Sequence, residues 1–111
     1  MYDTSILDRA LRERRGRLAA EQADLRGRVE RALIALRDRF DVRSAYIVGS
    51  LQSPDRWRED ADVDVAVGGC SDAVLDVMKA IEDATDRVVD VIDLDRHPFP
   101  EPVTRSGIKV Y

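Results

Sequence analysis

The sequence predicts a small α+β domain in which one long helix precedes a small mixed sheet with further helices. Two observations support this prediction. Apolar residues recur every three, four or seven positions between residues 4 and 40, which is the period of a helix. From Arg43 onward the pattern changes to short valine-rich runs that end at glycines, as buried strands do. With 111 residues, 44% of them hydrophobic, the chain has the length and apolar content of one structural domain.

Residues 1–40 are predicted to form an amphipathic helix with Thr4 or Ser5 as its cap. The apolar stripe consists of Leu7, Leu11, Leu18, Leu25, Val29, Leu33, Leu36 and Phe40. An unbroken helix of this length is roughly 55 Å long, about twice the width of a body of about 70 residues. The helix must therefore either break, at Gly16 or Gly27, or project beyond the body.

The stripe is expected to have two uses along its length. We expect the part beyond Leu25 to belong to the core and the part before it to form an interface. Leu11, Leu18 and Leu25 are one heptad apart, which favours packing against a helix of a partner protein or of a second copy.

Residues 41–111 are predicted to form the rest of the domain. Strands are expected at 45–48, 63–67, 87–94 and 108–111, with a loop at 51–61 and a helical turn near 103–106. Ser71 or Asp72 is expected to cap a second helix. Its apolar face is predicted to be Val74, Leu75, Met78 and Ile81.

Composition excludes several classes of protein. The net charge of -4 combines +3 over residues 1–40 with -7 over residues 41–111, and an acidic domain is a poor binder of nucleic-acid backbones. No apolar run has the ~20 residues that a membrane span needs, and the first residues are too polar for a signal peptide. The single cysteine, Cys70, allows no internal disulfide. We therefore expect a cytoplasmic protein without a membrane partner.

Three aspartates lie in the predicted strands. Side chains alternate along a strand, so Asp62 and Asp64 share one face while Val63 points to the other. Asp90 lies in a second valine-rich strand. If the two strands are neighbours, three carboxylates converge into an oxygen-ligand site of the kind that Mg²⁺ occupies. The alternative is a solvated acidic edge strand.

Gly49 and Ser50 follow the first predicted strand directly. Glycine lets a backbone approach a ligand closely, and the Ser50 N–H and hydroxyl could hold phosphate oxygens. Neither the Gly-Ser pair nor the Asp-x-Asp pair is specific alone. Their combination, in the order strand, Gly-Ser, loop, Asp-x-Asp strand, helix, strand with Asp90, is a much stronger signal.

These motifs resemble the minimal nucleotidyltransferases of the DNA polymerase beta superfamily. The resemblance rests on Val48-Gly49-Ser50, on residues 62–67 and 89–94, and on the tail at 105–111, and it covers roughly residues 43–111. Members of this MNT type occur as antitoxins beside HEPN-domain toxins. The long amino-terminal helix is an addition found in some members.

The resemblance implies a polymerase-beta-like fold and a metal-dependent reaction. Asp62, Asp64 and Asp90 would bind two Mg²⁺ ions, Asp90 would help to accept a proton, and Gly49 and Ser50 would hold the triphosphate of ATP. The reaction implied by the resemblance is the transfer of AMP to a hydroxyl group, with release of pyrophosphate. In the antitoxin members the acceptor is a tyrosine of the HEPN toxin, which AMPylation inactivates.

The sequence departs from the family pattern after Ser50. Residues 51–54 replace the family's small residue, arginine and glycine, and eleven residues separate Ser50 from Asp62 where ten are usual. Arg56 or Arg58 is a candidate to replace the missing arginine. Trp57, in the same loop, is expected to be either a hydrophobic plug or a lid over the nucleotide base.

Three other functions compete with this interpretation. A catalytically weak domain of the same fold would neutralise its toxin by occlusion, which the altered residues after Ser50 favour. Nucleotide transfer to a small molecule is a second alternative, but such enzymes usually have a further substrate-binding domain. DNA binding through the arginines of the first helix is the third, and the acidity of residues 41–111 opposes it.

Overall fold

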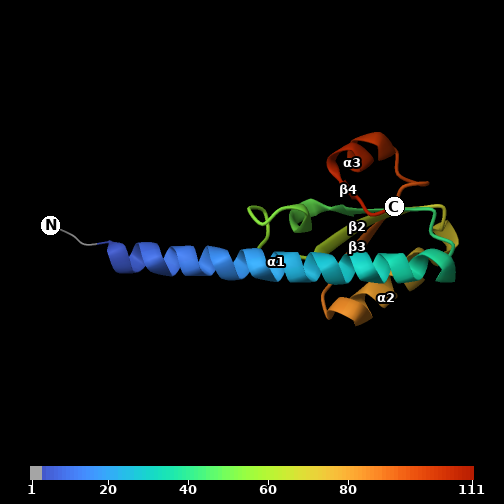
Figure 1. Ribbon diagram of the computed structural model, residues 1–111. Coiled ribbons are helices and arrows are strands. Elements are labelled where there is room, and N and C mark those ends of the chain that lie inside the picture. Colours follow the sequence, from blue (N-terminus) through green and yellow to red (C-terminus); the bar gives the residue numbers. More distant parts are fainter. Residues whose placement is uncertain (1–3) are drawn as a thin grey trace.

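The computed structural model describes residues 4–111 and has the predicted order of elements (Figure 1). The elements are α1 (Ser5–Arg39), β1 (Ser44–Val48), the 3₁₀ turn η1 (Gly49–Gln52), β2 (Val63–Gly68), η2 (Ser71–Ala73), α2 (Val74–Thr85), β3 (Val89–Asp93), α3 (Pro100–Ser106) and β4 (Ile108–Lys109). The α+β class and the long first helix are thereby confirmed.

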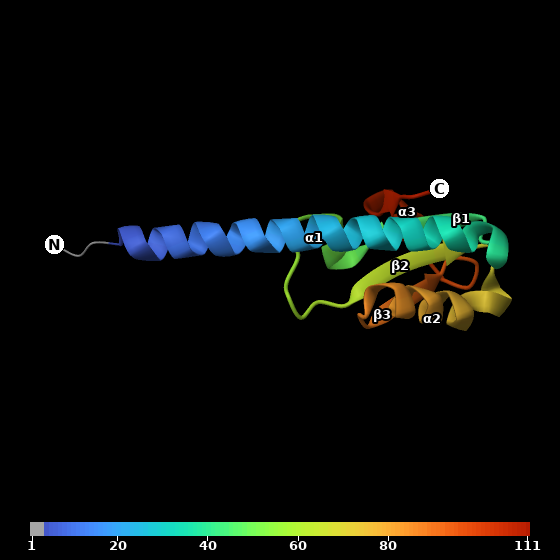
Figure 2. The same cartoon turned by 60° about the horizontal axis from the view of Figure 1, so that its bottom comes forward.

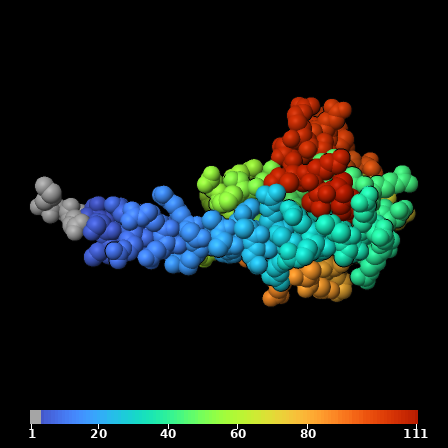
Figure 3. Space-filling view, in the orientation of Figure 1, coloured from blue at the N-terminus to red at the C-terminus, as the bar shows by residue number. Residues whose placement is uncertain are grey.

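Helix α1 is unbroken and projects beyond the rest of the molecule. Neither Gly16 nor Gly27 interrupts it, because an isolated glycine in a helix costs only about 1 kcal/mol relative to alanine. The molecule is 62 Å long and 28 Å by 19 Å across. Figures 2 and 3 show the amino-terminal part of α1, in blue, standing clear of the body. The length of the helix required it either to break or to project beyond the body, and it projects.

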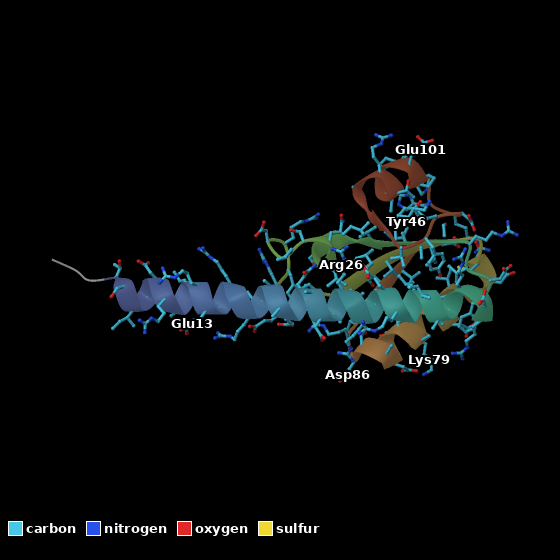
Figure 4. The ribbon with its side chains drawn as sticks, in the orientation of Figure 1. Glu13, Arg26, Tyr46, Lys79, Asp86 and Glu101 are labelled. Carbon is cyan, nitrogen blue, oxygen red and sulfur yellow. The ribbon has the colours of Figure 1, made fainter. Side chains whose placement is uncertain are left out.

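The two parts of α1 differ in burial. Leu25, Val29, Leu33 and Leu36 are at most 4% exposed and belong to the main core, as predicted. On the projecting part, Ile6, Leu7 and Leu11 are 83%, 57% and 44% exposed. Glu13 lies on this projecting part (Figure 4).

The four strands form one mixed sheet in the order β3-β2-β1-β4. β2 and β3 are parallel and are connected through α2, while β1 is antiparallel to both β2 and β4. The register pairs Ile47 with Val65, and Val65 with Val91. This arrangement aligns the starts of β2 and β3 with the end of β1.

The two faces of the sheet are covered by different helices. Val63, Val65 and Val67 pack in the main core with residues of α1 and α2. On the opposite face, Ala66 packs with Tyr46 of β1 and Val103 of α3. Figure 1 shows α3 on one side of the sheet and the other two helices on the other side, and Tyr46 lies between the sheet and α3 (Figure 4).

Helix α2 differs from its prediction in cap and face. Ser71 and Asp72 lie in η2, and the N-cap is Ala73, which makes no side-chain capping bond. The buried residues are Val77, Ile81 and Thr85, whereas Leu75 is 74% exposed. The predicted face correctly included Ile81, which is buried, and Met78, which packs against the core, but it was wrong for Leu75. The buried face is formed by residues 77, 81 and 85, and residue 77 lies about 200° around the helix from Leu75.

Among residues 4–111, no helix is both long enough and apolar enough to cross a membrane.

Candidate functional site

The register of the parallel strands places two of the predicted aspartates side by side. Asp64 of β2 is paired with Asp90 of β3. Asp62 immediately precedes β2 and has the same alternation as Asp64. The charges of both Asp90 and Asp62 act on the Asp64 carboxyl group. The structure therefore places Asp64 beside Asp90, and the charge of Asp62 acts on the same carboxyl group.

Asp64 is the electrostatic centre of this acidic cluster. Its pKa is raised above the usual 3.8, first because burial removes the carboxylate from water, then because Asp90 and Asp62 are negative, and finally because of a hydrogen bond with Asp90. Asp62 and Asp90 are themselves exposed. The cluster therefore opposes its own full ionisation, and a bound cation would relieve that repulsion.

The described residues, 4–111, contain no group of three or more acidic, histidine or cysteine side chains already arranged to hold a metal ion. Asp64 and Asp90 instead lie opposite each other on neighbouring strands. Carboxylate oxygens are nevertheless the ligands that Mg²⁺ prefers, and a magnesium site is usually completed by water and phosphate oxygens. The donor set therefore fits Mg²⁺ chemically.

The Gly-Ser turn lies directly against Asp64. Val48 at the end of β1 is paired with Asp64, and Gly49 follows with a φ of +69°. A Cβ atom at this position would overlap the Asp64 carboxylate. Both the backbone conformation and the close approach therefore require glycine at position 49.

A shallow pocket of ≈ 330 Å³ opens beside this turn. Its lining residues are Val48, Gly49, Gln52, Arg56, Asp64, Ile92, Val103 and Ser106. Arg56 is therefore the arginine that reaches the candidate site. Arg58 lines a different pocket, together with Arg14 and Leu18 of α1. Ser50 is half-buried in η1 and does not line the pocket.

Gln52, Val103 and Ser106 are among the lining residues that were not predicted as site residues from the sequence. In the amide orientation that satisfies both its oxygen and its nitrogen, Gln52 accepts a hydrogen bond from the Gly49 N–H at 3.0 Å and donates one to the Ser106 carbonyl oxygen. This bridge joins η1 to α3. No local motif marks these residues, because α3 meets the end of β1 only in the folded chain.

Trp57, Asp93 and Asp95 have structural roles. Trp57 is 3% exposed and belongs to the main core, so it is a plug and not a lid. Asp93 Oδ1 accepts a hydrogen bond from the Asp95 N–H at 3.0 Å, and Asp95 Oδ2 accepts one from the Gly69 N–H at 2.7 Å. These two carboxylates stabilise turns at the ends of β2 and β3.

Comparison with known proteins supports the fold. No protein-family model matches the sequence, and no curated protein is significantly similar to it. One similar crystal structure is that of the toxin–antitoxin MntA–HpeT in a mutant form, in which two aspartates separated by one residue are replaced by glutamate. Its sequence is 19% identical and its TM-score is 0.60, and the match covers 74% of this chain and 71% of that chain. A second is a toxin–antitoxin with AMP-PNP, 21% identical, with a TM-score of 0.62, over 74% and 72%.

Identity at this level establishes the fold alone. The chain shares its fold with these toxin–antitoxin structures, and its α+β architecture, a small mixed sheet preceded by a long helix, is the one that the sequence predicted.

Proposed function

We propose that this protein is a Mg²⁺-dependent nucleotidyltransferase that transfers AMP from ATP to a hydroxyl group of a partner protein. The observation that supports it most directly is the pairing of Asp64 with Asp90 beside the Gly49 turn. Carboxylates on neighbouring strands are able to hold Mg²⁺, and a glycine beside them lets the backbone approach a triphosphate closely. One similar structure contains AMP-PNP, an ATP analogue, which is consistent with the proposed substrate.

Asp62, Asp64 and Asp90 are the proposed ligands of two Mg²⁺ ions. When bound, Mg²⁺ would neutralise the triphosphate and polarise its α-phosphate. In one similar toxin–antitoxin structure, the two replaced aspartates have the same spacing as Asp62 and Asp64.

The remaining roles belong to the turn and its loop. The backbone at Gly49 and Ser50 holds the triphosphate, and Arg56 supplies the positive charge that residues 51–54 lack. The acceptor hydroxyl oxygen forms a bond to the α-phosphorus as the bond to pyrophosphate breaks. Asp90, which is exposed on its strand, accepts the hydroxyl proton.

The proposed acceptor is a tyrosine of a HEPN-domain toxin in the cytoplasm. The two structures compared above are toxin–antitoxin structures, which supports a toxin as the partner. The projecting part of α1 offers exposed apolar residues, Ile6, Leu7 and Leu11, among several arginines. We propose this surface as the contact with the toxin, or with a second copy of this chain.

A second candidate function is neutralisation of the toxin by occlusion without chemistry. Leu51, which follows Ser50, is completely buried, and Gln52 bridges Gly49 and Ser106. These positions therefore present no arginine to a triphosphate, which weakens the expected phosphate grip. Transfer of AMP to a small molecule has no comparable observation in its favour.

One experiment separates the two functions. The protein is incubated with ATP labelled at the α-phosphate, Mg²⁺ and the product of the neighbouring open reading frame. Covalent label on that partner is the expected result, and it should be lost on omission of Mg²⁺. If the partner is neutralised in a parallel activity assay but remains unlabelled, occlusion is the correct function and transfer is excluded.

A further inference from the structure

The loop between the Gly-Ser turn and the acidic pair determines where two site residues lie. We call residues 53–62 the site loop. It contains Arg56, which lines the pocket, and it ends at Asp62. Two backbone hydrogen bonds form within it, from the Arg56 N–H to the Ser53 carbonyl at 3.1 Å and from the Ala61 N–H to the Arg58 carbonyl at 3.1 Å. Such turns leave the orientation of the whole loop to contacts from outside it.

Arg87, between α2 and β3, makes several of those contacts with one guanidinium group. Its Nη2 donates to the carbonyl oxygens of Glu59 at 2.9 Å and Ala61 at 2.8 Å. The same guanidinium lies 4.8 Å from the centroid of the Trp57 ring. Its Nη1 lies 3.5 Å from Glu21 Oε1 of α1. One side chain therefore connects the site loop to the first helix.

We infer that Arg87 is a positioning residue that fixes the site loop, so that Arg56 faces the pocket and Asp62 stands beside Asp64. The inference rests on the proposed nucleotidyl transfer, in which Arg56 contacts the phosphates and Asp62 is a metal ligand. The anchoring requires arginine, because a planar fork of donors serves two carbonyls and an aromatic face together. A lysine ammonium retains the charge but not that geometry.

The other end of the segment is held by the same turn of α1. Gln22, 3% exposed, follows Glu21 and donates from Nε2 to the Leu51 carbonyl oxygen at 2.7 Å. This carbonyl belongs to a residue that is completely buried, so its loss of a partner would be costly. The chain on both sides of the site loop is thus attached to Glu21 and Gln22, and the long helix is part of the site's support.

The test uses the full chain and the variants Arg87→Gln and Arg87→Lys. Trp57 is the only tryptophan, so its fluorescence reports the site loop alone. The matched control is Arg28→Gln, which removes the same charge and also breaks a guanidinium–carbonyl bond, from Arg28 Nη2 to Ala84 at 2.8 Å, outside the loop. The measured quantities are the Trp57 emission maximum, the Kd for Mg²⁺–ATP, and kcat and KM for transfer.

We expect Arg87→Gln to red-shift Trp57 emission and to weaken Mg²⁺–ATP binding about tenfold, with a smaller effect for Arg87→Lys and none for Arg28→Gln. A double-mutant cycle identifies the route. If Arg87 acts through the loop, Arg87→Gln should weaken binding by less than about threefold when Arg56→Gln is already present.

Provided that the wild-type protein binds Mg²⁺–ATP, any of three results would overturn the inference. They are an unshifted Trp57 spectrum in Arg87→Gln, a shifted spectrum with unchanged affinity, and full additivity with Arg56→Gln. Equal losses in Arg28→Gln would likewise assign the effect to general stability. If the wild-type protein binds no Mg²⁺–ATP, the proposed function fails, and the positioning role of Arg87 fails with it. The Trp57 spectrum then shows only whether Arg87 holds the loop.

Discussion

The two faces of β2 have opposite chemistry although their residues alternate along one six-residue strand. Val63, Val65 and Val67 are completely buried against α1 and α2. On the other face, Ala66 is covered by the short helix α3, while Asp64 lies at the pocket beside Asp90. One face therefore provides the hydrophobic stabilisation of the fold, and the other provides the candidate chemistry.

The difference shows how a small domain separates stability from function. The valine face is sealed by two helices of 35 and 12 residues, so each methyl group there contributes to the core. The aspartate face is covered by one helix of seven residues, which leaves one end of the strands open. Carboxylates that would be intolerable in the core are tolerated at that open end.

The largest expected effect is on the aspartate face. Asp64→Ala and Asp90→Ala should each lower the rate of AMP transfer at least a hundredfold, because metal ligands contribute several kcal/mol to such reactions, about 1.4 kcal/mol per tenfold. Circular dichroism and thermal unfolding should show an intact fold. Transfer at the wild-type rate in either variant would remove these residues from the site.

The neighbouring residue Val65 should give the opposite result. Val65→Ala removes two buried methyl groups and should lower the free energy of unfolding by about 2 kcal/mol. The transfer activity of the protein that remains folded should be unchanged. Urea unfolding and activity assays at low temperature measure the two quantities, and a specific loss of activity would mean that the two faces are not separable.

Gly49→Ala should affect both properties to a moderate degree. The left-handed conformation at this position costs a non-glycine residue about 1–2 kcal/mol, and the added Cβ would displace the Asp64 carboxylate. We expect lower stability and weaker Mg²⁺–ATP binding together, measured by urea unfolding and calorimetry. If only stability changes, the turn does not contact the nucleotide.

Tyr111, which packs against the core on the valine face, should make the folded state less stable at alkaline pH. Its hydroxyl donates to the Leu33 carbonyl oxygen at 2.8 Å, and burial raises its pKa from 10.0 to about 12. The stability that this group contributes is present below pH 10 and is lost as pH rises toward 12. Tyr111→Phe should cost about 1 kcal/mol at pH 8 and show a shallower alkaline decline. Unfolding at a series of pH values tests this.

The smallest expected effect is the dependence of folding stability on acidic pH through Asp64, on the aspartate face. Because the pKa of Asp64 is raised, the protein without metal should gain stability from this group as pH falls toward 3.8, and should lack that gain at neutral pH. Asp64→Asn should therefore slightly raise the Tm of the metal-free protein at pH 7, with no difference near pH 4. A lower Tm at pH 7 would mean that the carboxylate stabilises the fold.

Much of the site could be predicted because it depends on local rules. Alternation alone assigned Asp62 and Asp64 to one face, and the valines around Asp90 indicated a second strand. What could not be predicted was the choice between Arg56 and Arg58, which are two residues apart in a loop without periodicity. The structure turns Arg56 to the pocket and Arg58 toward α1.

The buried face of α2 was predicted only in part, for a related reason: Ile81 is buried as expected, whereas Leu75 is not. Several apolar residues in that helix satisfy a helical stripe, and periodicity cannot choose between neighbouring stripes when both are apolar. Packing against the sheet selects Val77 and leaves Leu75 exposed. Trp57 and Arg87, thirty positions apart, could not be linked by any local pattern.

The sequence by itself determined the order of elements, the alternating faces of β2 and the residues of the acidic cluster, since these follow from side-chain chemistry and short-range geometry. Tertiary structure alone decided that α1 projects unbroken, that Asp64 is paired with Asp90, and that Gln22 and Arg87 hold the chain around the site. These contacts join residues far apart in the chain, and they form only because burial of the valine face brings the helices and strands together.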